Sequence, residues 1–228
     1  MPFIRYVQKH PSAGLLLIQF VGLLLYPWME TAPRGRALFG AFGLVVLGVA
    51  LYVVRRTPSL NWIATLLALP VVALALIQLL WPDARLMVLT AALEAAFYFY
   101  ATGSLITYML DDDTATTDEL WAAGATFTLL AWAFAYAFYV CQAWFPGSFT
   151  AAVDPEQPRT WMELLFLSFT NLSATGLGDV LPMSAPARVL VMFEQFAGVA
   201  YIATVVSRLI GLTIVTERRT KDERAPRS

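Results

Sequence analysis

Residues 160–184 read TWMELLFLSFTNLSATGLGDVLPMS and constrain the architecture more than any other part of the chain. Thr160 and Glu163 have the spacing of a capping box, in which the threonine oxygen accepts from the Glu163 backbone N–H and the carboxylate reaches back. A helix therefore begins here. The apolar residues 161–172 would rise about 1.5 Å each and cover less than about 20 Å, which is too short for a hydrocarbon core of about 30 Å. The pattern predicts a re-entrant helix.

The segment SATGLGD at residues 173–179 cannot comfortably continue as regular helix, because two glycines flank one residue. Non-helical backbone at membrane depth must be buried in protein or face water, since each unsatisfied carbonyl in lipid costs several kcal/mol. A row of carbonyls around a water-filled axis meets this demand and binds dehydrated cations. The negative end of the preceding helix would favour cations further. An ordinary loop is disfavoured, because the segment has few polar side chains.

The whole chain has the composition of a membrane protein. Its 228 residues are 59% hydrophobic and 14% charged, with a mean hydropathy of +0.65, whereas soluble domains are about 45–50% apolar and about 25% charged. The apolar residues form six candidate spans at residues 13–29, 37–54, 61–81, 86–110, 120–145 and 187–212. We therefore expect an all-α membrane protein with six transmembrane helices and the re-entrant helix between the fifth and sixth. A soluble enzyme is excluded.

The positive charges predict the orientation of the chain. Six spans with the N-terminus inside place ten Lys and Arg residues in the cytoplasm and five outside, which favours cytoplasmic termini. The inner set is Arg5, Lys9, Arg55, Arg56, Arg208, Arg218, Arg219, Lys221, Arg224 and Arg227, and the outer set is Arg34, Arg36, Arg85, Arg159 and Arg188. The net charge of −1 gives no basic field for nucleic acid, so we expect no nucleic-acid partner.

Residues 120–212 resemble the pore module of tetrameric potassium channels. The resemblance rests on the short capped helix, the sequence TGLGD, Pro182 three residues beyond its aspartate, and a last span opening at Ser184. Within that span Glu194, Gly198 and Tyr201 are similar to the pattern of the small prokaryotic channel family. The resemblance implies an outer helix, a pore helix, a selectivity filter and an inner helix.

The resemblance also implies what these residues do. Four chains would surround one axis as a homotetramer in membrane lipid, in the inner membrane of a prokaryotic cell, and potassium ions would be permeant ligands rather than a cofactor. The filter would bind these ions through backbone carbonyls of Ala174, Thr175, Gly176 and Leu177, with Gly178 completing the filter. Asp179 would stand at the filter mouth, where it attracts cations or satisfies backbone amides. Gly198 would be a gating hinge or a site of close helix packing.

The filter departs from the TVGYG of that family. Ala174 stands in place of threonine, Thr175 in place of valine and Leu177 in place of tyrosine, while the pore-helix positions that brace the tyrosine are Phe166 and Leu167. Bracing would then rest on apolar packing of Leu177. We expect weaker discrimination against sodium or readier inactivation, although a Gly-Leu-Gly filter is similar to one pore loop of two-pore-domain potassium channels. A non-selective monovalent cation channel and a non-conducting channel-like subunit are the alternatives.

Both filter glycines are intact, and their backbone angles matter for the carbonyl rings. Gly176 and Gly178 are expected to adopt angles that only glycine tolerates, which aim successive carbonyls one way.

The rest of the chain divides into a peripheral four-helix domain at residues 1–110, an acidic linker at 111–119, the pore domain at 120–212 and a short charged tail at 213–228. We expect no regulatory domain in a tail of this length. The fourth span holds Glu94 as its only charge, so a conventional voltage sensor is not expected. Glu94 is either a functional acid or hydrogen-bonded to a tyrosine such as Tyr98.

The linker carries five carboxylates, on Asp111, Asp112, Asp113, Asp118 and Glu119. Hard oxygen ligands of this kind could bind calcium and regulate the channel. The alternative is a solvated linker in which Asp118 and Glu119 favour the positive N-terminus of the fifth span.

Two further classes of membrane protein fit poorly. An intramembrane enzyme would need a catalytic constellation, but His10 lies outside the spans and Cys141 has no histidine near it in sequence. A secondary transporter would show paired broken helices in two similar halves, and only one interrupted segment is found.

Overall fold

The computed structural model describes residues 6, 9–31, 35–57, 61–111, 116–212 and 214. Within these residues the chain forms seven α-helices, a π-helical turn and two short strands. They are α2 (Pro11–Thr31), α3 (Gly35–Val54), α4 (Asn61–Leu80), α5 (Ala84–Leu110), α6 (Thr117–Trp144), β1 (Phe149–Ala151), α7 (Trp161–Leu172), β2 (Val180–Pro182), α8 (Ala185–Tyr201) and the π-helical turn Ile202–Val206.

Each of the six expected spans is helical, with ends a few residues from those expected. Four helical stretches are long and apolar enough to cross a membrane: Pro11–Trp28, Ala84–Leu110, Thr117–Trp144 and Ala185–Leu212. In α3 and α4 the apolar stretches are shorter, at Gly40–Val54 and Trp62–Gln78. The protein is therefore an integral membrane protein with several candidate spans, and the count of six stays a prediction.

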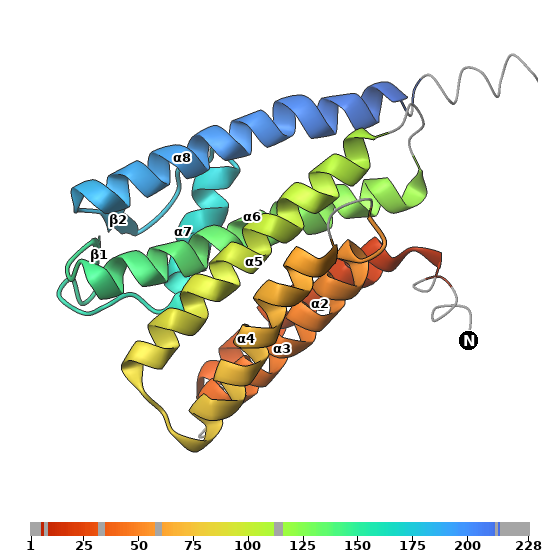
Figure 1. The fold of residues 1–228 in the computed structure, drawn as a ribbon. Helices are drawn as coiled ribbons and strands as arrows, with labels where there is room; N and C mark the ends of the chain where they lie inside the picture. The colour runs from red at the N-terminus through yellow and green to blue at the C-terminus, as the bar shows by residue number, and fades with distance from the viewer. Residues whose placement is uncertain are drawn as a thin grey trace, which may run out of the picture.

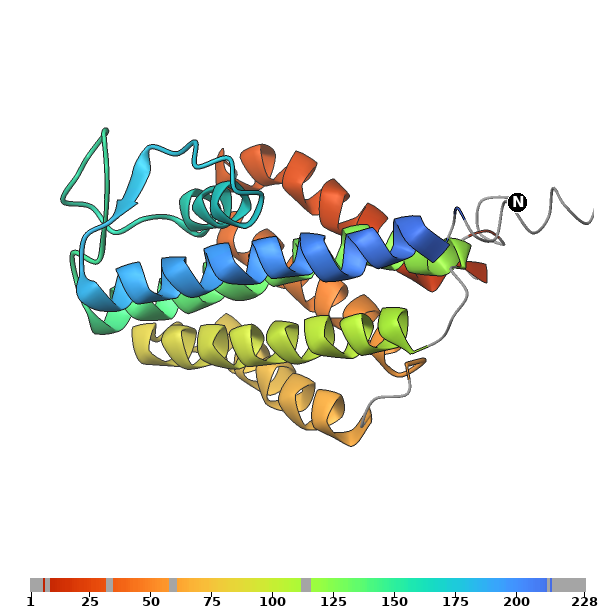
Figure 2. The same ribbon diagram turned by 90° about the horizontal axis from the view of Figure 1, so that it is seen from above.

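The helices run back and forth along one bundle with α6 at its centre (Figures 1 and 2). The longest packing seam joins α5 to α6, while α2, α7 and α8 pack on other faces of α6. Large fully buried side chains fill the centre, among them Trp132, Tyr98, Phe97 and Phe138. The end of α5, the start of α6 and the end of α8 lie together at one end of the bundle. The strands β1 and β2 and the predicted filter at residues 173–179, called the filter segment below, lie toward the other end.

A two-stranded sheet, which we did not predict from the sequence, lies at the end of the bundle opposite the start of α6. Strands β1 and β2 are antiparallel, and Phe149 is paired with Pro182, Thr150 with Leu181 and Ala151 with Val180. The strands precede and follow α7, and their backbone N–H and C=O groups form hydrogen bonds with each other. The pairing fixes the chain directly after Asp179.

The predicted start of α7 is confirmed. The Glu163 backbone N–H donates to Thr160 Oγ1 at 3.3 Å, and the Thr160 N–H donates to Glu163 Oε2 at 2.6 Å. The helix begins at Trp161 and ends at Leu172, as the apolar run indicated. Ser184 caps α8 in the same way, its side chain accepting from the Ala187 N–H.

Candidate functional site: the pore helix and filter segment

The filter segment folds back over the C-terminus of α7. The Thr170 carbonyl accepts from the backbone N–H groups of Thr175 and Gly176, both at 3.1 Å, and the Asn171 carbonyl accepts from Ala174 N–H at 3.0 Å. The last carbonyls of a helix have no intrahelical partner. The filter segment supplies those partners, so the end of α7 determines where the filter begins.

The backbone carbonyls of the filter itself are left free. Among the described residues, no N–H or side-chain donor is bonded to a carbonyl oxygen of residues 173–178. All seven residues from Ser173 to Asp179 are exposed in the single chain. The segment therefore combines anchored N–H groups with unpartnered oxygens, which is the arrangement a cation requires.

Two residues of the filter segment have a positive φ. Gly176 has a φ of +64°, as expected, and Ala174 has a φ of +57°. Gly178 is not among the glycines with a positive φ. An alanine in the left-handed region costs of order 1–3 kcal/mol. The Ala174 N–H bond to the Asn171 carbonyl helps to hold the turn there.

Side-chain hydroxyls tie the segment to α7. Thr175 Oγ1 donates to the Thr170 carbonyl at 3.2 Å and lies 3.0 Å from Ser173 Oγ. Ser173 Oγ donates to the Phe169 carbonyl at 2.7 Å. Both hydroxyls are therefore engaged with the carbonyls of α7 and with each other.

The expected packing of Leu177 is not made within one chain. Leu177 is 72% exposed, and Phe166 on α7 is 48% exposed. Both side chains lie at the rim of an open cavity that also includes Met162, Gly178 and Asp179. No brace for Leu177 comes from the described part of its own chain.

Asp179 is exposed, and its carboxylate has no hydrogen bond or ion pair with any described residue. Of the two roles considered for it, satisfaction of backbone amides is therefore not observed.

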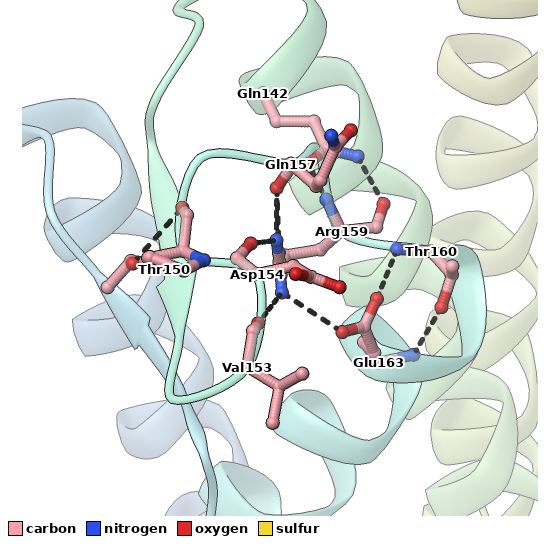
Figure 3. Close-up of polar contacts among 9 residues, drawn as sticks. Gln142, Thr150, Val153, Asp154, Gln157, Arg159, Thr160 and Glu163 are labelled. Carbon is pink, nitrogen blue, oxygen red and sulfur yellow. Dashed lines mark hydrogen bonds and ion pairs between the residues drawn. The ribbon is translucent and has the colours of Figure 1, made fainter.

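Arg159 organises the loop above α7 (Figure 3). Its guanidinium is nearly buried, with the side chain 3% exposed. It donates to the carbonyls of Gln157 at 2.9 Å and Val153 at 3.3 Å, and also to that of Asp154. It pairs with Glu163 Oε1 at 3.2 Å. The sequence predicted only that Arg159 is a positive charge outside the membrane. Its partners are mostly backbone carbonyls, which every residue type has, so the sequence could not reveal them.

Gln142 at the end of α6 clamps the backbone of the same arginine. Its amide donates to the Arg159 carbonyl at 2.8 Å and accepts from the Arg159 N–H at 3.0 Å. The start of α7 is thereby fixed to α6 on one side and to the outer loop on the other.

Gly198 on α8 lies directly against the end of α7. A Cβ added to Gly198 would be 2.2 Å from the Leu172 carbonyl oxygen. The structure thus accounts for this glycine by a close helix approach. Its role as a gating hinge stays a prediction.

Glu94 is bonded to a different tyrosine from the one suggested by helical spacing. Its carboxyl is hydrogen-bonded to Tyr136 of α6. The Tyr98 hydroxyl is buried and has no hydrogen-bond partner among the described residues. The partner comes from the neighbouring helix, which a single-helix pattern could not show.

The acidic linker is only partly described. Asp112 and Asp113 lie outside the described residues, and Asp111 is the C-cap of α5. Asp118 accepts from the Ser12 N–H at 3.1 Å and from Ser12 Oγ at 2.9 Å, so it caps the start of α2. Glu119 forms a capping box with Thr116. In the described chain no group of three acidic, histidine or cysteine side chains could hold a metal.

Comparison with known proteins identifies the region just described. Residues 124–214 match a protein family described as ion channel. This part of the chain is an ion channel pore domain. Its boundaries enclose most of α6 together with α7, the filter segment and α8. The assignment is to a channel and not to an enzyme. The chain has no significant match to a curated protein or to a solved structure.

Proposed function

We propose that the protein is a homotetrameric channel that conducts potassium ions through residues 174–178. The free carbonyls of this segment are the observation that carries the proposal, because oxygens with no internal partner can replace the hydration shell of an ion. One chain supplies one row of oxygens. Four chains are needed to close rings around an axis.

The exposed apolar residues of the pore domain support assembly. Side chains spaced three and four residues apart form an uncovered stripe on α8: Val189, Met192, Phe193, Phe196 and Val199. Leu177 and Phe166 are exposed on the same domain. Neighbouring copies would cover these residues and supply the brace that Leu177 lacks in its own chain.

The departures in the filter predict its selectivity. Ala174 has no hydroxyl for an innermost ring of ligands, and Leu177 cannot donate a hydrogen bond to brace the filter. We therefore expect potassium preference that is weaker than in a tyrosine-braced filter. These same two residues favour the second candidate, a non-selective monovalent cation channel.

Contacts between helix ends support cytoplasmic termini and an even number of crossings. Asp118 at the start of α6 binds Ser12 at the start of α2, and Arg208 donates to the Leu110 carbonyl at the end of α5. These ends belong on one side of the membrane. The inner membrane of a prokaryotic cell is the proposed location.

Conventional voltage gating is not proposed, because the single charge within α5 after Arg85 is Glu94 and a voltage sensor needs several positive charges.

The test is a bi-ionic recording from purified protein in planar bilayers, with potassium on one side and sodium on the other. We expect a cation current whose reversal potential favours potassium without reaching strict selectivity. A reversal potential at zero would establish the non-selective alternative. Absence of current from protein shown by mass measurement to be tetrameric would establish a non-conducting subunit.

A filter variant ties the current to the proposed oxygens. Gly176→Ala places a side chain on a residue with a φ of +64°, so it should distort the carbonyl row and remove most of the current. Gly48→Ala is the matched control, because nothing lies within 4 Å of an added Cβ there. Equal loss in both variants would count against the filter assignment.

A further inference from the structure

Glu194 is a fully buried carboxyl in the middle of α8, with 0% of the residue exposed. Its two oxygens are bonded to α7: Oε1 to Ser168 Oγ, and Oε2 to Asn171 Nδ2 at 3.1 Å. The one ion pair among the described residues joins Arg159 to Glu163, so no described basic side chain neutralises Glu194. A buried carboxylate without a cation is costly. The sequence marked Glu194 only as part of an inner-helix pattern.

The hydrogen bonds around Ser168 can be counted proton by proton. Ser168 Oγ lies 2.9 Å from the Ala131 carbonyl of α6 and is also bonded to Glu194 Oε1. A serine hydroxyl carries one proton, and a carbonyl can only accept. If Ser168 donates to Ala131, the bond to Glu194 needs a second proton, which only the carboxyl can provide. A neutral Glu194 donates to Ser168 and accepts from Asn171, and every bond is then satisfied.

Asn171 links this cluster to the filter segment. The Asn171 side chain donates to Glu194, and the Asn171 carbonyl accepts from the N–H of Ala174, the first filter residue. Gly198, four residues after Glu194, contacts the backbone of Leu172. One face of α8 therefore contacts the last turn of α7 twice. Glu194 binds the Asn171 side chain, and Gly198 packs on the Leu172 main chain.

We propose that Glu194 is a neutral carboxyl that positions the pore helix and, through Asn171, the inner end of the filter. The inference rests on the proposed function, because positioning the filter matters to the protein only if ions pass through it. Glu194 is a positioning residue, since it touches pore-helix groups and not the permeant ion.

Three substitutions separate this role from simple packing. Glu194→Gln keeps one donor and one acceptor, so it should reproduce the wild-type reversal potential and inactivation. Glu194→Leu keeps approximate size but leaves Ser168 and Asn171 without their partner, and Glu194→Asp is too short to reach both. We expect both of these to shift the reversal potential towards zero or to remove the current.

The opposite result would overturn the proposal. An ionised Glu194 would accept from both Ser168 and Asn171, and the Gln amide would then place a donor against a donor. Failure of Glu194→Gln with retention of function in Glu194→Asp would show that the charge is needed. Wild-type behaviour of Glu194→Leu would show that the cluster does not position the filter.

Infrared difference spectroscopy tests the proton without relying on conduction. The spectrum of wild type minus Glu194→Gln should contain the carbonyl-stretching band of a protonated carboxylic acid, which shifts in heavy water. Carboxylate bands in its place would overturn the neutral state. Glu156→Gln, on the exposed outer loop, should leave the Glu194 band in place. A protein with this band but no wild-type current would refute the proposed function and leave the neutral carboxyl standing.

Discussion

At Gly198 the missing side chain allows α8 to touch the main chain of the pore helix. An added Cβ would meet the Leu172 carbonyl oxygen, carbonyl carbon and Cα, all within 2.8 Å. Main-chain atoms cannot rotate away as a flexible side chain does. Any larger residue must therefore separate α8 from α7.

Gly198→Ala should accordingly destabilise the protein by about 1–3 kcal/mol, the usual cost of overpacking. It should also impair conduction, because Leu172 precedes the filter directly. Gly103→Ala is the control, since nothing lies within 4 Å of an added Cβ there and alanine favours a helix by about 1 kcal/mol over glycine. Thermal unfolding in detergent and bilayer recording measure the two effects. Equal stability of the two variants would contradict the close approach.

Glu94 and its tyrosine give a second prediction at the scale of single residues. Tyr136→Phe removes the hydrogen-bond partner of Glu94 and should cost about 1–3 kcal/mol, because a buried polar group is left unsatisfied. Tyr98→Phe is a matched control in which a hydroxyl without a partner is removed, so its cost should be small. Urea unfolding of both variants in detergent decides between them. A larger cost for Tyr98→Phe would favour the same-helix pairing.

Among the elements, the pore helix was the most predictable from sequence because its signals are local. Thr160, Glu163 and Ser184 cap helices through neighbours three residues away, and such spacings can be seen in one sequence. The same reasoning failed for the pairing of β1 with β2, which joins residues 149–151 to residues 180–182. Long-range pairing of such short segments leaves no periodic pattern.

The sequence predicted that regular helix ends before residues 173–179, and α7 does end at Leu172, but the backbone angles of the following segment were not predicted. Unusual backbone angles were expected at the two glycines, and Gly176 has a positive φ, but Ala174 at the end of α7 has one as well. Hydrogen bonds to the carbonyls of Thr170 and Asn171 decide the outcome. These bonds join backbone groups across the turn after α7, so no particular residue type marks them in the sequence.

The outer loop before α7 depends on one arginine. Arg159→Gln removes most of the donors that reach the carbonyls of residues 153, 154 and 157 and the Glu163 carboxylate. We expect faster proteolysis within residues 145–160 and a reduced current, because α7 loses its outer anchor. Arg85→Gln, an exposed arginine on α5, should change neither. An unaltered cleavage pattern in Arg159→Gln would contradict the anchoring role.

Across the whole molecule, the peripheral helices are attached to the pore domain by aromatic and polar contacts. Tyr98 of α5 stacks on Tyr136 of α6 at 5.8 Å between ring centroids, and Tyr136 contacts Trp161 of α7 at 5.5 Å. Tyr26 of α2 also reaches Trp161 at 6.3 Å. The first residue of the pore helix is therefore in contact with both the outer helix and the peripheral domain.

The clamp between Asp118 and Ser12 provides a test at this scale. Asp118→Ala removes both acceptors from the start of α2 and should increase amide hydrogen exchange at Ser12 and the following residues. Calcium should not change the exchange rate there in the wild type, because both Asp118 oxygens already bind Ser12. Calcium-dependent protection of this region would favour the regulatory role of the acidic linker instead.

The π-helical turn Ile202–Val206 lies just beyond the part of α8 that Glu194 and Gly198 fasten to the pore helix. Such turns are frequent at functional sites, and they interrupt the regular hydrogen-bond ladder. Below the turn, Arg208 is bonded to the end of α5, and Leu209 belongs to a small separate core with Met109 and Tyr201. In the proposed channel, a pull from the peripheral helices would thus displace α8 beyond the turn, while residues 174–176 stay bonded to the end of α7.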